Sequence, residues 1–479
     1  MGSPPWAEAS GHEQYFVLLT GANSGVGLGI GQRIIDEFLA ERSLSSHLIL
    51  IPTTRSADKS RETILALRAH LDNTARTSKQ LRARAGPDYD PRTAVGRVHV
   101  LSVQLDLCNL RSVYAAADQL VHGKLTDPTG LIDDASIPRI DAAILNAGIG
   151  GWQGIDWLQF LKQILSVGLV QSTSFPSFKI ALPAAVLDQQ KLLGEKGLSP
   201  GAAPPPELGE VFCANVFGHY ILAHELLPLL GRSSPDEEPG RVIWTSSVDT
   251  GREHFDHDDF QATRRSPPYE SSKRITDLLA LTADLPSVRP VSAPYFTSSS
   301  SSSSFSARQR PVAVEPRFYL SHPGIVCTPL FPLHWLLFWG YYLAMLVARW
   351  AGSPWHMVAP YAGARAPAWL ALADAGALDA AGARRAKWGS ARGRTGPALP
   401  KKTEVDGWGW EGRVEDPARD ADADGGEEAG ILAKARGRRW CAVATTEETR
   451  AAFEEDGRRC WAELERLRLA WEAALGRGG

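Results

Sequence analysis

The chain has 479 residues and a formal net charge of −3 at neutral pH, and no basic patch stands out, so we expect no nucleic-acid partner. Its five cysteines show neither metal-ligand spacing nor a paired framework, which predicts a reducing compartment and no metal site. We expect one core domain over 12–375, with insertions near 72–95, 176–209 and 286–316, followed by an extension over 376–479.

The first predicted element is a strand that runs into a glycine-rich turn and then a helix. An apolar run over 15–19 precedes Thr20, and three glycines follow in the spacing T-G-x-x-x-G-x-G. Glycines let the backbone turn tightly and approach a ligand, and the start of a helix offers free N–H groups to a pyrophosphate. The pattern predicts a dinucleotide site. The residues expected to form it are Gly21, Asn23, Ser24, Gly25, Val26 and Gly27.

A second strand is predicted over 47–52, and Thr53-Thr54-Arg55 follows it. In dinucleotide-binding folds an acid at the end of this strand suits the ribose hydroxyl of NAD, whereas an arginine suits the ribose phosphate of NADP. Arg55 occupies that place, Lys59 is nearby, and no acid comes before Asp58. The sequence therefore favours NADPH. The alternative is that Arg55 only begins a solvated loop.

Further strands are predicted over 98–107, 140–145, 241–247 and 317–328, and helical patterns separate the strands. This alternation indicates a parallel sheet with right-handed crossovers. The predicted fold class is α/β, a doubly wound Rossmann sheet with insertions and a C-terminal helical extension. Polar or small residues end or follow the strands: Asp106, Asn146-Ala147-Gly148, Ser246-Ser247, and Pro323-Gly324 with Thr328.

Tyr269 and Lys273 stand four residues apart at the start of a predicted helix and so share one face. An ammonium beside a phenol favours the phenolate, and we expect it to lower the tyrosine pKa from its usual value of about 10. A tyrosine tuned in this way can donate or accept a proton at a carbonyl or an alcohol. Alone the pair is a weak signal, but here it follows a dinucleotide motif.

Two later segments predict features outside the sheet. The run Ser298 to Ser304 lies in a Pro- and Ser-rich stretch that predicts a disordered loop, with a gene-model artefact as the alternative. The segment 330–348 contains no charged residue and is rich in Trp and Tyr. It predicts an interfacial, membrane-associating helix, and the alternatives are a buried wall of the substrate cleft and a spanning helix.

The C-terminal extension is predicted to be partly disordered and to end in a helix. Residues 415–428 are acidic and predict a solvated linker. Residues 446–475 predict a helix that Thr446 caps. Its apolar residues are spaced toward one face, namely Phe453, Cys460, Trp461, Leu464, Leu467 and Trp471. We expect that face to pack on the core, and a partner-binding helix is the alternative.

In this order the motifs resemble the short-chain dehydrogenase/reductase family over residues 15 to about 330. Within that family they look like the fungal 3-keto-steroid reductases of sterol synthesis. The closer likeness rests on Thr53-Thr54-Arg55, Trp244-Thr245-Ser246-Ser247, the segment 268–274 and His322-Pro323-Gly324. The resemblance implies an oxidoreductase that uses NADPH to reduce a 3-ketosteroid to the 3β-hydroxysteroid, in the C4-demethylation step of ergosterol biosynthesis.

The resemblance also implies roles for single residues. Tyr269 would protonate the ketone oxygen, and Lys273 would lower the pKa of that tyrosine and hold the nicotinamide ribose. Ser247, rather than Ser246, would hydrogen-bond the substrate oxygen. Asn215 would hold a proton-relay water, and the alternative is an asparagine packed at a helix bend. The residues implied to line the cofactor are Asp106, Asn146, Ala147, Gly148, Val326 and Thr328. For Asp106 an ordinary strand-end cap is the alternative.

A cellular setting follows from the same resemblance. It implies a sterol substrate and a place on the endoplasmic reticulum membrane and the lipid droplet, with the active domain facing the cytosol. The protein partners considered are other sterol-synthesis enzymes and a second copy of the chain in a homodimer. Two rival functions stay open. One is a short-chain reductase of another lipophilic carbonyl, such as a retinal or a fatty aldehyde; the other is a non-catalytic NADP-binding scaffold of a sterol-synthesis complex.

Overall fold

The structure is a computed structural model that describes residues 4–194, 198, 203–265, 267–297, 313–328, 335–415 and 437–477. The serine run 298–304 and nearly all of the acidic stretch 415–428 lie outside these ranges. The loop and the linker predicted there therefore stay predictions.

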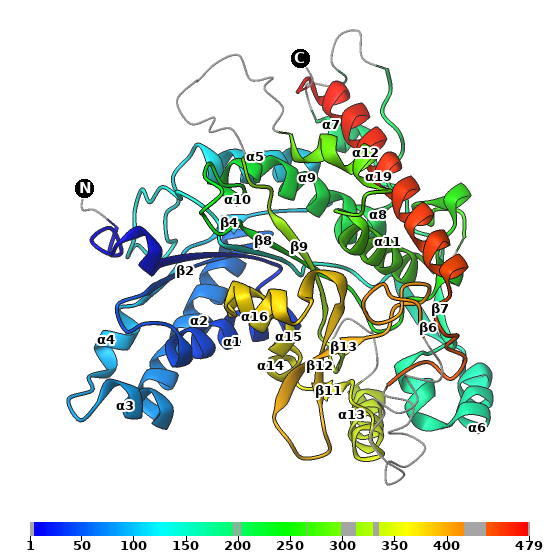
Figure 1. The fold of residues 1–479 in the computed structure, drawn as a ribbon, viewed down its shortest axis with the longest axis horizontal. Coiled ribbons are helices and arrows are strands. Elements are labelled where there is room, and N and C mark those ends of the chain that lie inside the picture. Colours follow the sequence, from blue (N-terminus) through cyan, green and yellow to red (C-terminus); the bar gives the residue numbers. More distant parts are fainter. Residues whose placement is uncertain are drawn as a thin grey trace.

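A nine-stranded sheet forms the centre of the molecule, with the order β13-β12-β9-β8-β5-β1-β2-β3 and with β4 paired to β2 (Figure 1). Its pairs are parallel except for β12 with β13. The strands are β1 (Gln14–Thr20), β2 (His47–Thr54), β3 (Val98–Val100), β4 (Val103–Gln104), β5 (Ala142–Leu145), β8 (Arg241–Thr245), β9 (Arg317–His322), β12 (Lys387–Arg392) and β13 (Ala398–Thr403). The predicted α/β fold with a mostly parallel sheet is confirmed.

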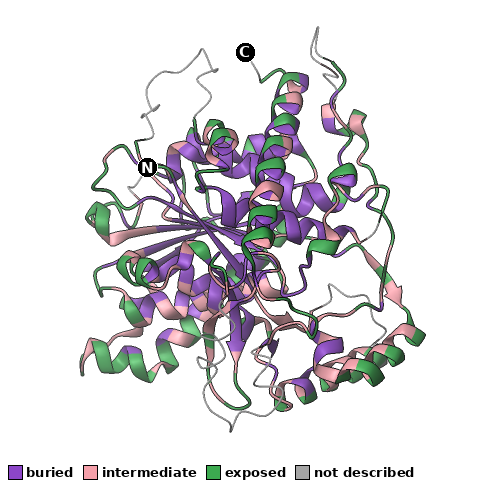
Figure 2. Cartoon of the chain, turned by 45° about the vertical axis from the view of Figure 1, so that its right-hand side comes forward, coloured by how far each residue is buried: buried purple, intermediate pink, exposed green. Residues whose placement is uncertain are grey.

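Strand β1 shows why the sheet lies between two layers of helices. Phe16 and Leu18 belong to the core on one face of the sheet, and Val17 and Leu19 belong to the core on the other. All four side chains are fully buried. A strand with both faces covered needs apolar residues in succession rather than in alternation. The central strands are accordingly buried along their length (Figure 2).

Helices pack on both faces of this sheet. One face is covered by α1 (Gly25–Glu41), α2 (Ala57–Thr77) and α15 (Arg365–Leu372). The other is covered by α5 (Leu110–Val121), α9 (Gly218–Glu225), α11 (Pro268–Thr282) and α19 (Glu447–Leu475). The three-layer arrangement buries an apolar stripe of each helix, as a doubly wound fold requires.

Shorter elements connect these layers or lie outside them. The helical ones are α3 (Lys79–Ala85), α4 (Pro91–Val95), α6 (Trp157–Ser174), α7 (Gln189–Leu193), α8 (Glu210–Phe212), α10 (Leu227–Leu230), α12 (Arg289–Ser292), α13 (Trp335–Trp350), α14 (Pro360–Gly363) and α16 (Ala375–Ala380). Two further strand pairs are β6 (Trp152–Ile155) with β7 (Lys179–Ala181), and β10 (Ile325–Val326) with β11 (His356–Val358).

The strand order reverses at β1, which lies between β2 and β5. In open α/β sheets this reversal leaves a crevice at the carboxyl ends of the strands, and ligands bind there. The turns after β1, β5 and β8 converge on that edge together with the start of α1. The fold therefore brings the motifs at the strand ends to one place.

The single strand predicted over 98–107 is wrong, because the structure breaks it into β3 and β4. The break lies opposite Pro52 of β2, whose ring nitrogen carries no hydrogen for the ladder. Ser102 fills the gap, and its hydroxyl donates to the Pro52 carbonyl (3.3 Å) and to the Ser60 hydroxyl (2.7 Å). Pairing resumes at Thr53 with Val103.

The sheet does not end at residue 375, where the sequence places the end of the core domain. Strands β12 and β13 lie beyond that residue and form one edge of the sheet. The C-terminal helix is confirmed as α19, whose Thr446 hydroxyl accepts from the Thr449 N–H. Its apolar face is buried against α11, so the core-packing interpretation of this helix holds.

The apolar segment 330–348 lies partly outside the described residues, and its described part begins with α13. Within the described ranges, every helix is too short or too polar to cross a bilayer. Helix α13 buries Met345 and Ala348, while it leaves Leu337, Trp339 and Leu343 exposed. It packs against α6, near β11.

Candidate active site

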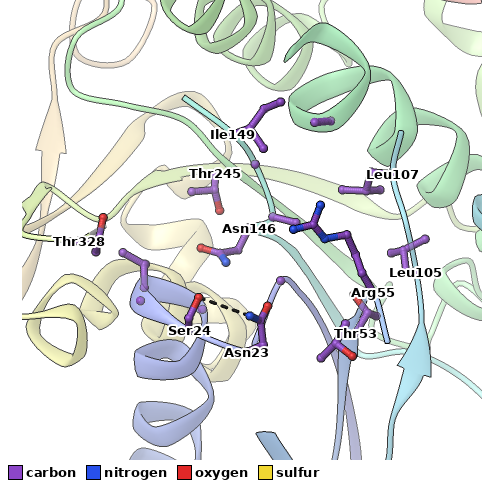
Figure 3. A pocket seen from close by; sticks show the side chains of 18 of the residues that line it. Asn23, Ser24, Thr53, Arg55, Leu105, Leu107, Asn146, Ile149, Thr245 and Thr328 are labelled. Carbon is purple, nitrogen blue, oxygen red and sulfur yellow. Dashed lines mark hydrogen bonds between the residues drawn. The ribbon is translucent and has the colours of Figure 1, made fainter. Parts of the chain in front are cut away.

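Two cavities open at the carboxyl edge of the sheet and meet at Tyr269. The first, of about 450 Å³, lies between the turns that follow β1, β2, β5 and β8 (Figure 3). The second, of about 430 Å³, lies between β6, β7, α6 and α13. Four residues line both cavities, namely Val26, Tyr269, Pro323 and Thr328.

The glycine turn after β1 is shaped by steric limits. Gly21 has φ +66° and Gly25 has φ +52°, which is left-handed backbone that side chains disfavour. A Cβ on Gly21 would lie 2.8 Å from the Cα of Ala147, and one on Gly27 would lie 2.0 Å from the Gly21 carbonyl. These positions require glycine because two loops touch there.

The start of α1 is open to a ligand. Its N-cap, Ser24, makes no side-chain hydrogen bond to the first turn of the helix. The N–H groups of that turn have no intrahelical partners and can therefore bind an anion. Asn23 and Ser24 line the cavity beside this turn (Figure 3). The turn thus offers what a pyrophosphate needs.

Thr20 fixes the turn after β5. Its hydroxyl accepts from the N–H groups of Asn146 (2.9 Å) and Ala147 (3.0 Å). The Asn146 side chain in turn donates to the Thr20 carbonyl (3.2 Å). The sequence singled out Thr20 only as part of the motif spacing, and its role in holding 146–148 becomes visible from these contacts.

Arg55 and Asp106 lie at the far end of the first cavity. The exposed Arg55 follows β2, next to Leu105 and Leu107 in Figure 3. Asp106 lines the same cavity, and its carboxylate also accepts from the Cys108 N–H (3.1 Å). Asp106 therefore acts as a strand-end cap, as the alternative interpretation has it, and it faces the cavity as well.

Every residue predicted to line the cofactor borders the first cavity except Val326, which borders the second. Their binding roles stay predictions. Sequence reasoning did not predict six of the lining residues outside the motifs and at their edges, namely Leu105, Leu107, Cys108, Ile149, Ala214 and Thr245. Five of them lie directly beside a predicted residue and Cys108 lies two residues after Asp106, so neighbourhood in the chain could have indicated them.

The walls of the second cavity are mainly apolar and aromatic. They come from β6 and α6, from β7 and from α13, and they include Trp152, Phe160, Phe178, Tyr341 and Met345. The polar residues among them are fewer, namely Thr173, Ser174, Lys179, Ser247, Asp249, Tyr269 and Thr328. A cavity of this composition suits an apolar ligand that presents few polar groups.

Ser247 faces the second cavity together with Tyr269. Its hydroxyl accepts from the Asp249 N–H (3.2 Å) and is hydrogen-bonded to Tyr269. The two hydroxyls therefore lie together at the junction of the cavities. They can contact one substrate oxygen there.

Ser246 has a different environment. Its hydroxyl donates to the carboxylate of Asp277, which also pairs with Lys387 at 2.8 Å. Asp277 and Lys387 are both completely buried. Ser246 borders the first cavity but not the second, so the geometry favours Ser247 as the residue that meets the substrate, as predicted.

Lys273 lies beside Tyr269 on α11, with its Nζ 5.6 Å from the centre of the phenol ring. The ammonium donates to the Thr245 carbonyl at 2.8 Å. Burial lowers the pKa of Lys273 to about 8, although Asp277 acts in the opposite direction. The predicted pair is thus brought together, with Lys273 directed at the end of β8.

The predicted lowering of the Tyr269 pKa is wrong. Burial raises the pKa of Tyr269 to about 12, because the phenolate is poorly solvated inside the fold. The charge of Lys179 and the hydrogen bond from Ser247 act against this rise, whereas Glu270 and Asp249 add to it. Sequence reasoning missed Lys179, because only the tertiary fold brings β7 to this tyrosine.

Asn215 lies in a π-helical turn, Cys213–Phe217. Its side-chain oxygen accepts from the Ile149 N–H (2.8 Å), and its amide donates to the Ile149 carbonyl (3.1 Å) and the Ser272 hydroxyl (2.9 Å). The side chain therefore ties the turn after β5 to α11. This matches the alternative of an asparagine packed at a helix irregularity, and the relay-water role stays a prediction.

Comparison with curated proteins identifies close relatives, although a scan of protein-family models found no match. The 3-keto-steroid reductase of Gibberella zeae is 50% identical over 476 residues, which cover 98% of this chain and 97% of that protein. That of Aspergillus fumigatus is 41% identical over 471 residues, covering 96% and 94%. That of Schizosaccharomyces pombe is 27% identical over 395 residues, covering 82% and 90%.

Solved structures resemble the chain more distantly. A 3-oxoacyl-acyl-carrier-protein reductase from Brucella melitensis, solved in complex with NAD, is 14% identical with a TM-score of 0.37, and the match covers 75% of this chain and 90% of that one. This likeness is too weak to support any statement about the site. The sheet order and the curated relatives carry the assignment instead.

Proposed function

The chain belongs to the family of fungal 3-keto-steroid reductases, and on this basis we propose that it reduces the 3-keto group of a sterol to a 3β-hydroxyl with NADPH, in the C4-demethylation step of ergosterol biosynthesis. One observation carries the proposal: the cleft lined by the glycine turn and the strand ends meets an apolar cavity at Tyr269, and Ser247 faces the apolar cavity beside it. That junction is where a carbonyl must lie to receive a hydride and then a proton.

The apolar cavity supports a sterol as the substrate. Its volume of about 430 Å³ falls within the range of about 300–1,000 Å³ typical of small-molecule pockets. Its walls offer flat aromatic surfaces for a rigid ring system, and the hydroxyls of Ser247 and Tyr269 offer hydrogen bonds to a single oxygen.

The chemistry of the chain's own residues follows from their positions. The nicotinamide, when bound in the first cavity, supplies the hydride. As negative charge grows on the carbonyl oxygen, the hydroxyls of Ser247 and Tyr269 stabilise it, and Tyr269 then gives up its proton. The raised pKa of Tyr269, about 12, keeps the phenol protonated at neutral pH and suits a proton donor. Lys273 helps to hold the site in place through the end of β8.

The preference for NADPH rests on Arg55. It is exposed at the rim of the first cavity, next to Thr53 and Thr54. Among the described residues that line this cavity, Asp106 is the only acid. A guanidinium in that place can hold a ribose phosphate with two hydrogen bonds, which a ribose hydroxyl cannot match.

Association with a membrane rests on α6 and α13. Both helices border the second cavity, and both expose apolar side chains on their outer surfaces. On α13 these are Trp339, Leu343 and Trp350, and on α6 they are Leu158, Leu161 and Leu165, whereas the exposed Leu337 and Trp157 line the cavity itself. Such a surface favours the interfacial interpretation, combined with the cleft wall. We place the protein on the cytosolic side of the endoplasmic reticulum membrane and on the lipid droplet.

The scaffold alternative loses support, since Tyr269, Lys273 and Ser247 all lie at one site. A homodimer and contacts with other sterol-synthesis enzymes stay predictions. The test incubates the full chain in lipid vesicles with NADPH and a 3-ketosteroid, a retinal or a fatty aldehyde, and identifies the products by mass spectrometry. We expect the ketosteroid to gain two hydrogens. Faster turnover of the retinal or the aldehyde would reject the sterol proposal, and no turnover of any substrate would favour the scaffold.

A further inference from the structure

Lys179 is a buried cation beside the reactive tyrosine. It lies on β7, and its side chain is 13% exposed. Its Nζ is 2.9 Å from a carboxylate oxygen of Asp249 and also pairs with Glu270. The same atom lies 5.0 Å from the ring centre of Trp152, and that ring lies 4.4 Å from the ring of Tyr269.

The two acids that Lys179 joins are neighbours of the two reactive hydroxyls in the chain. Glu270 directly follows Tyr269 on α11. Asp249 comes two residues after Ser247, and its N–H donates to the Ser247 hydroxyl at 3.2 Å. Lys179 therefore bridges the segments that carry the proton donor and its partner, from a strand far away in the sequence.

The Lys179 bridge compensates the charge of two acids that are buried. The side chains of Glu270 and Asp249 are 2% and 8% exposed. One oxygen of Glu270 accepts from the Trp152 indole N–H (3.3 Å), and the other is buried with no hydrogen-bond partner in the described chain. A buried carboxylate without a cation is strongly unfavourable, so loss of Lys179 would leave Glu270 uncompensated beside Tyr269.

We propose that Lys179 is a positioning residue for the reaction assigned under the proposed function: by bridging Asp249 and Glu270 it holds the Ser247 and Tyr269 hydroxyls together and brings a positive charge to the phenol. The proposal rests on that function.

The charges around the phenol come from several elements. They are Lys179 on β7, Glu270 and Lys273 on α11, Asp249 after β8, and Arg439, which pairs with Asp249 at 2.7 Å and also with Glu253. Tyr341 of α13 is a further titratable group that lines the second cavity with Lys179, and the charge of Lys179 acts to lower its pKa. Although burial disfavours its charge, Asp249 and Glu270 raise the pKa of Lys179 and keep it protonated.

Removal of Lys179 should therefore raise the pKa of Tyr269. In the oxidation of a 3β-hydroxysteroid by NADP⁺, the tyrosine must first be deprotonated to act as the base. A higher pKa then moves the rising limb of the pH profile toward alkaline pH. A nearby opposite charge shifts a pKa by about 1–3 units, so we expect a displacement of about one pH unit.

The experiment measures kcat and KM in both directions between pH 6 and pH 10 for the parent, Lys179→Met and Lys179→Arg. Lys179→Met should lower kcat at least about tenfold and displace the oxidation profile, with NADPH binding by fluorescence unchanged. Lys179→Arg keeps the charge and should restore the parental profile. The control is Lys124→Met, which removes an exposed lysine that pairs with Asp134 at 3.3 Å. This variant should change neither kcat nor the pH profile of oxidation.

A double variant covers the case in which Lys179→Met does not fold. Lys179→Met with Glu270→Gln removes both charges of one pair, so the pH profile of oxidation should return toward that of the parent while kcat for reduction stays low. Parental kcat in the double variant, or an undisplaced profile in Lys179→Met, would overturn the role of Lys179. An inactive parent would instead reject the proposed function, so the two failures are distinct.

Discussion

The two cavities that meet at Tyr269 are built in different ways. The first is formed by turns at the ends of adjacent parallel strands, and its walls are mostly backbone and small side chains such as Gly21, Ala147 and Gly148. The second is formed by large aromatic side chains on β6, β7, α6 and α13. The first cavity is thus fixed by backbone geometry, and the second by side chains that only tertiary packing brings together.

This difference determines which parts of the site tolerate substitution and which do not. A Cβ at Gly27 would overlap the Gly21 carbonyl, so the first cavity tolerates no enlargement of its loop. In the second cavity, side chains can be exchanged while the strands stay in place. We therefore expect the cofactor to be set by the sheet, and the substrate by β6–α6–β7 and α13.

The largest expected effect concerns the residue that the cavities share. Tyr269→Phe removes only a hydroxyl, so both cavities keep their shape while the developing alkoxide loses its proton donor. Turnover should fall by about 10²–10⁴, the usual contribution of general acid catalysis. NADPH binding by fluorescence should persist. As a control, Tyr89→Phe removes a phenol that donates to the Ala75 carbonyl, away from the cavities, and should keep parental turnover.

Near-parental turnover of Tyr269→Phe would show that the junction of the cavities is not the reaction centre. Ser247→Ala should cost less than Tyr269→Phe, since it removes a hydrogen bond but not the proton. Ser246→Ala should be milder still, because Ser246 faces the buried Asp277 rather than the substrate cavity. The order of these three effects therefore tests the assignment of each hydroxyl.

The next largest effect concerns a substitution that should disrupt the first cavity and leave the second intact. Gly27→Ala places a Cβ 2.0 Å from the Gly21 carbonyl, and the turn must shift to relieve the clash. Overpacking of this kind costs about 1–3 kcal/mol, so NADPH affinity should fall at least about tenfold by fluorescence titration. Binding of a sterol to the second cavity should be unchanged. Gly393→Ala, where nothing lies within 4 Å of the new Cβ, is the matched control.

The same contrast explains how far sequence reasoning reached. The first cavity could be predicted residue by residue, because each strand end carries a local motif and parallel strands present their ends at one edge. Of the second cavity, the sequence offered only α13, as the cleft-wall alternative for 330–348. The walls from β6, α6 and β7, and with them Lys179, could not be found, since no local pattern connects residues 152–179 with the strand ends. The direction of the Tyr269 pKa was wrong for a related reason. Spacing reveals a neighbouring charge such as Lys273, but it does not reveal how deeply the phenol is buried.

Arg55 allows a finer test of the first cavity. Arg55→Ala removes the guanidinium that we expect at the ribose phosphate, and hydrogen bonds to charged groups contribute about 1.5–3 kcal/mol. The ratio of kcat/KM for NADPH over NADH should therefore fall by about 10–100-fold, mostly through weaker use of NADPH. Arg61→Ala, an exposed arginine on α2, should leave the ratio unchanged. Equal use of both cofactors by the parent would contradict the role of Arg55.

The smallest effect concerns the outer surface of the second cavity. Trp339 and Leu343 on α13 are 65% and 58% exposed, so replacing both with Glu removes no packing from the core. If this surface enters the lipid, the charges must be drawn into the interface or the helix must leave it. Complete burial of a large apolar side chain contributes about 1.5–3 kcal/mol, and a side chain at a lipid interface gains only part of this. Loss of the two apolar contacts should therefore reduce vesicle binding about tenfold.

The kinetic consequence separates the two interpretations of α13. With Trp339 and Leu343 both replaced by Glu, a sterol dissolved in vesicles should show a higher KM and an unchanged kcat. Its path into the cavity is impaired, while the reaction centre is intact. The control, Leu65→Glu, charges a leucine on α2 that is 54% exposed and lies on the far side of the sheet from α11. If the double α13 variant bound vesicles like the parent and kept its KM, α13 would act only as a wall of the cavity, and the membrane contact would have to lie elsewhere.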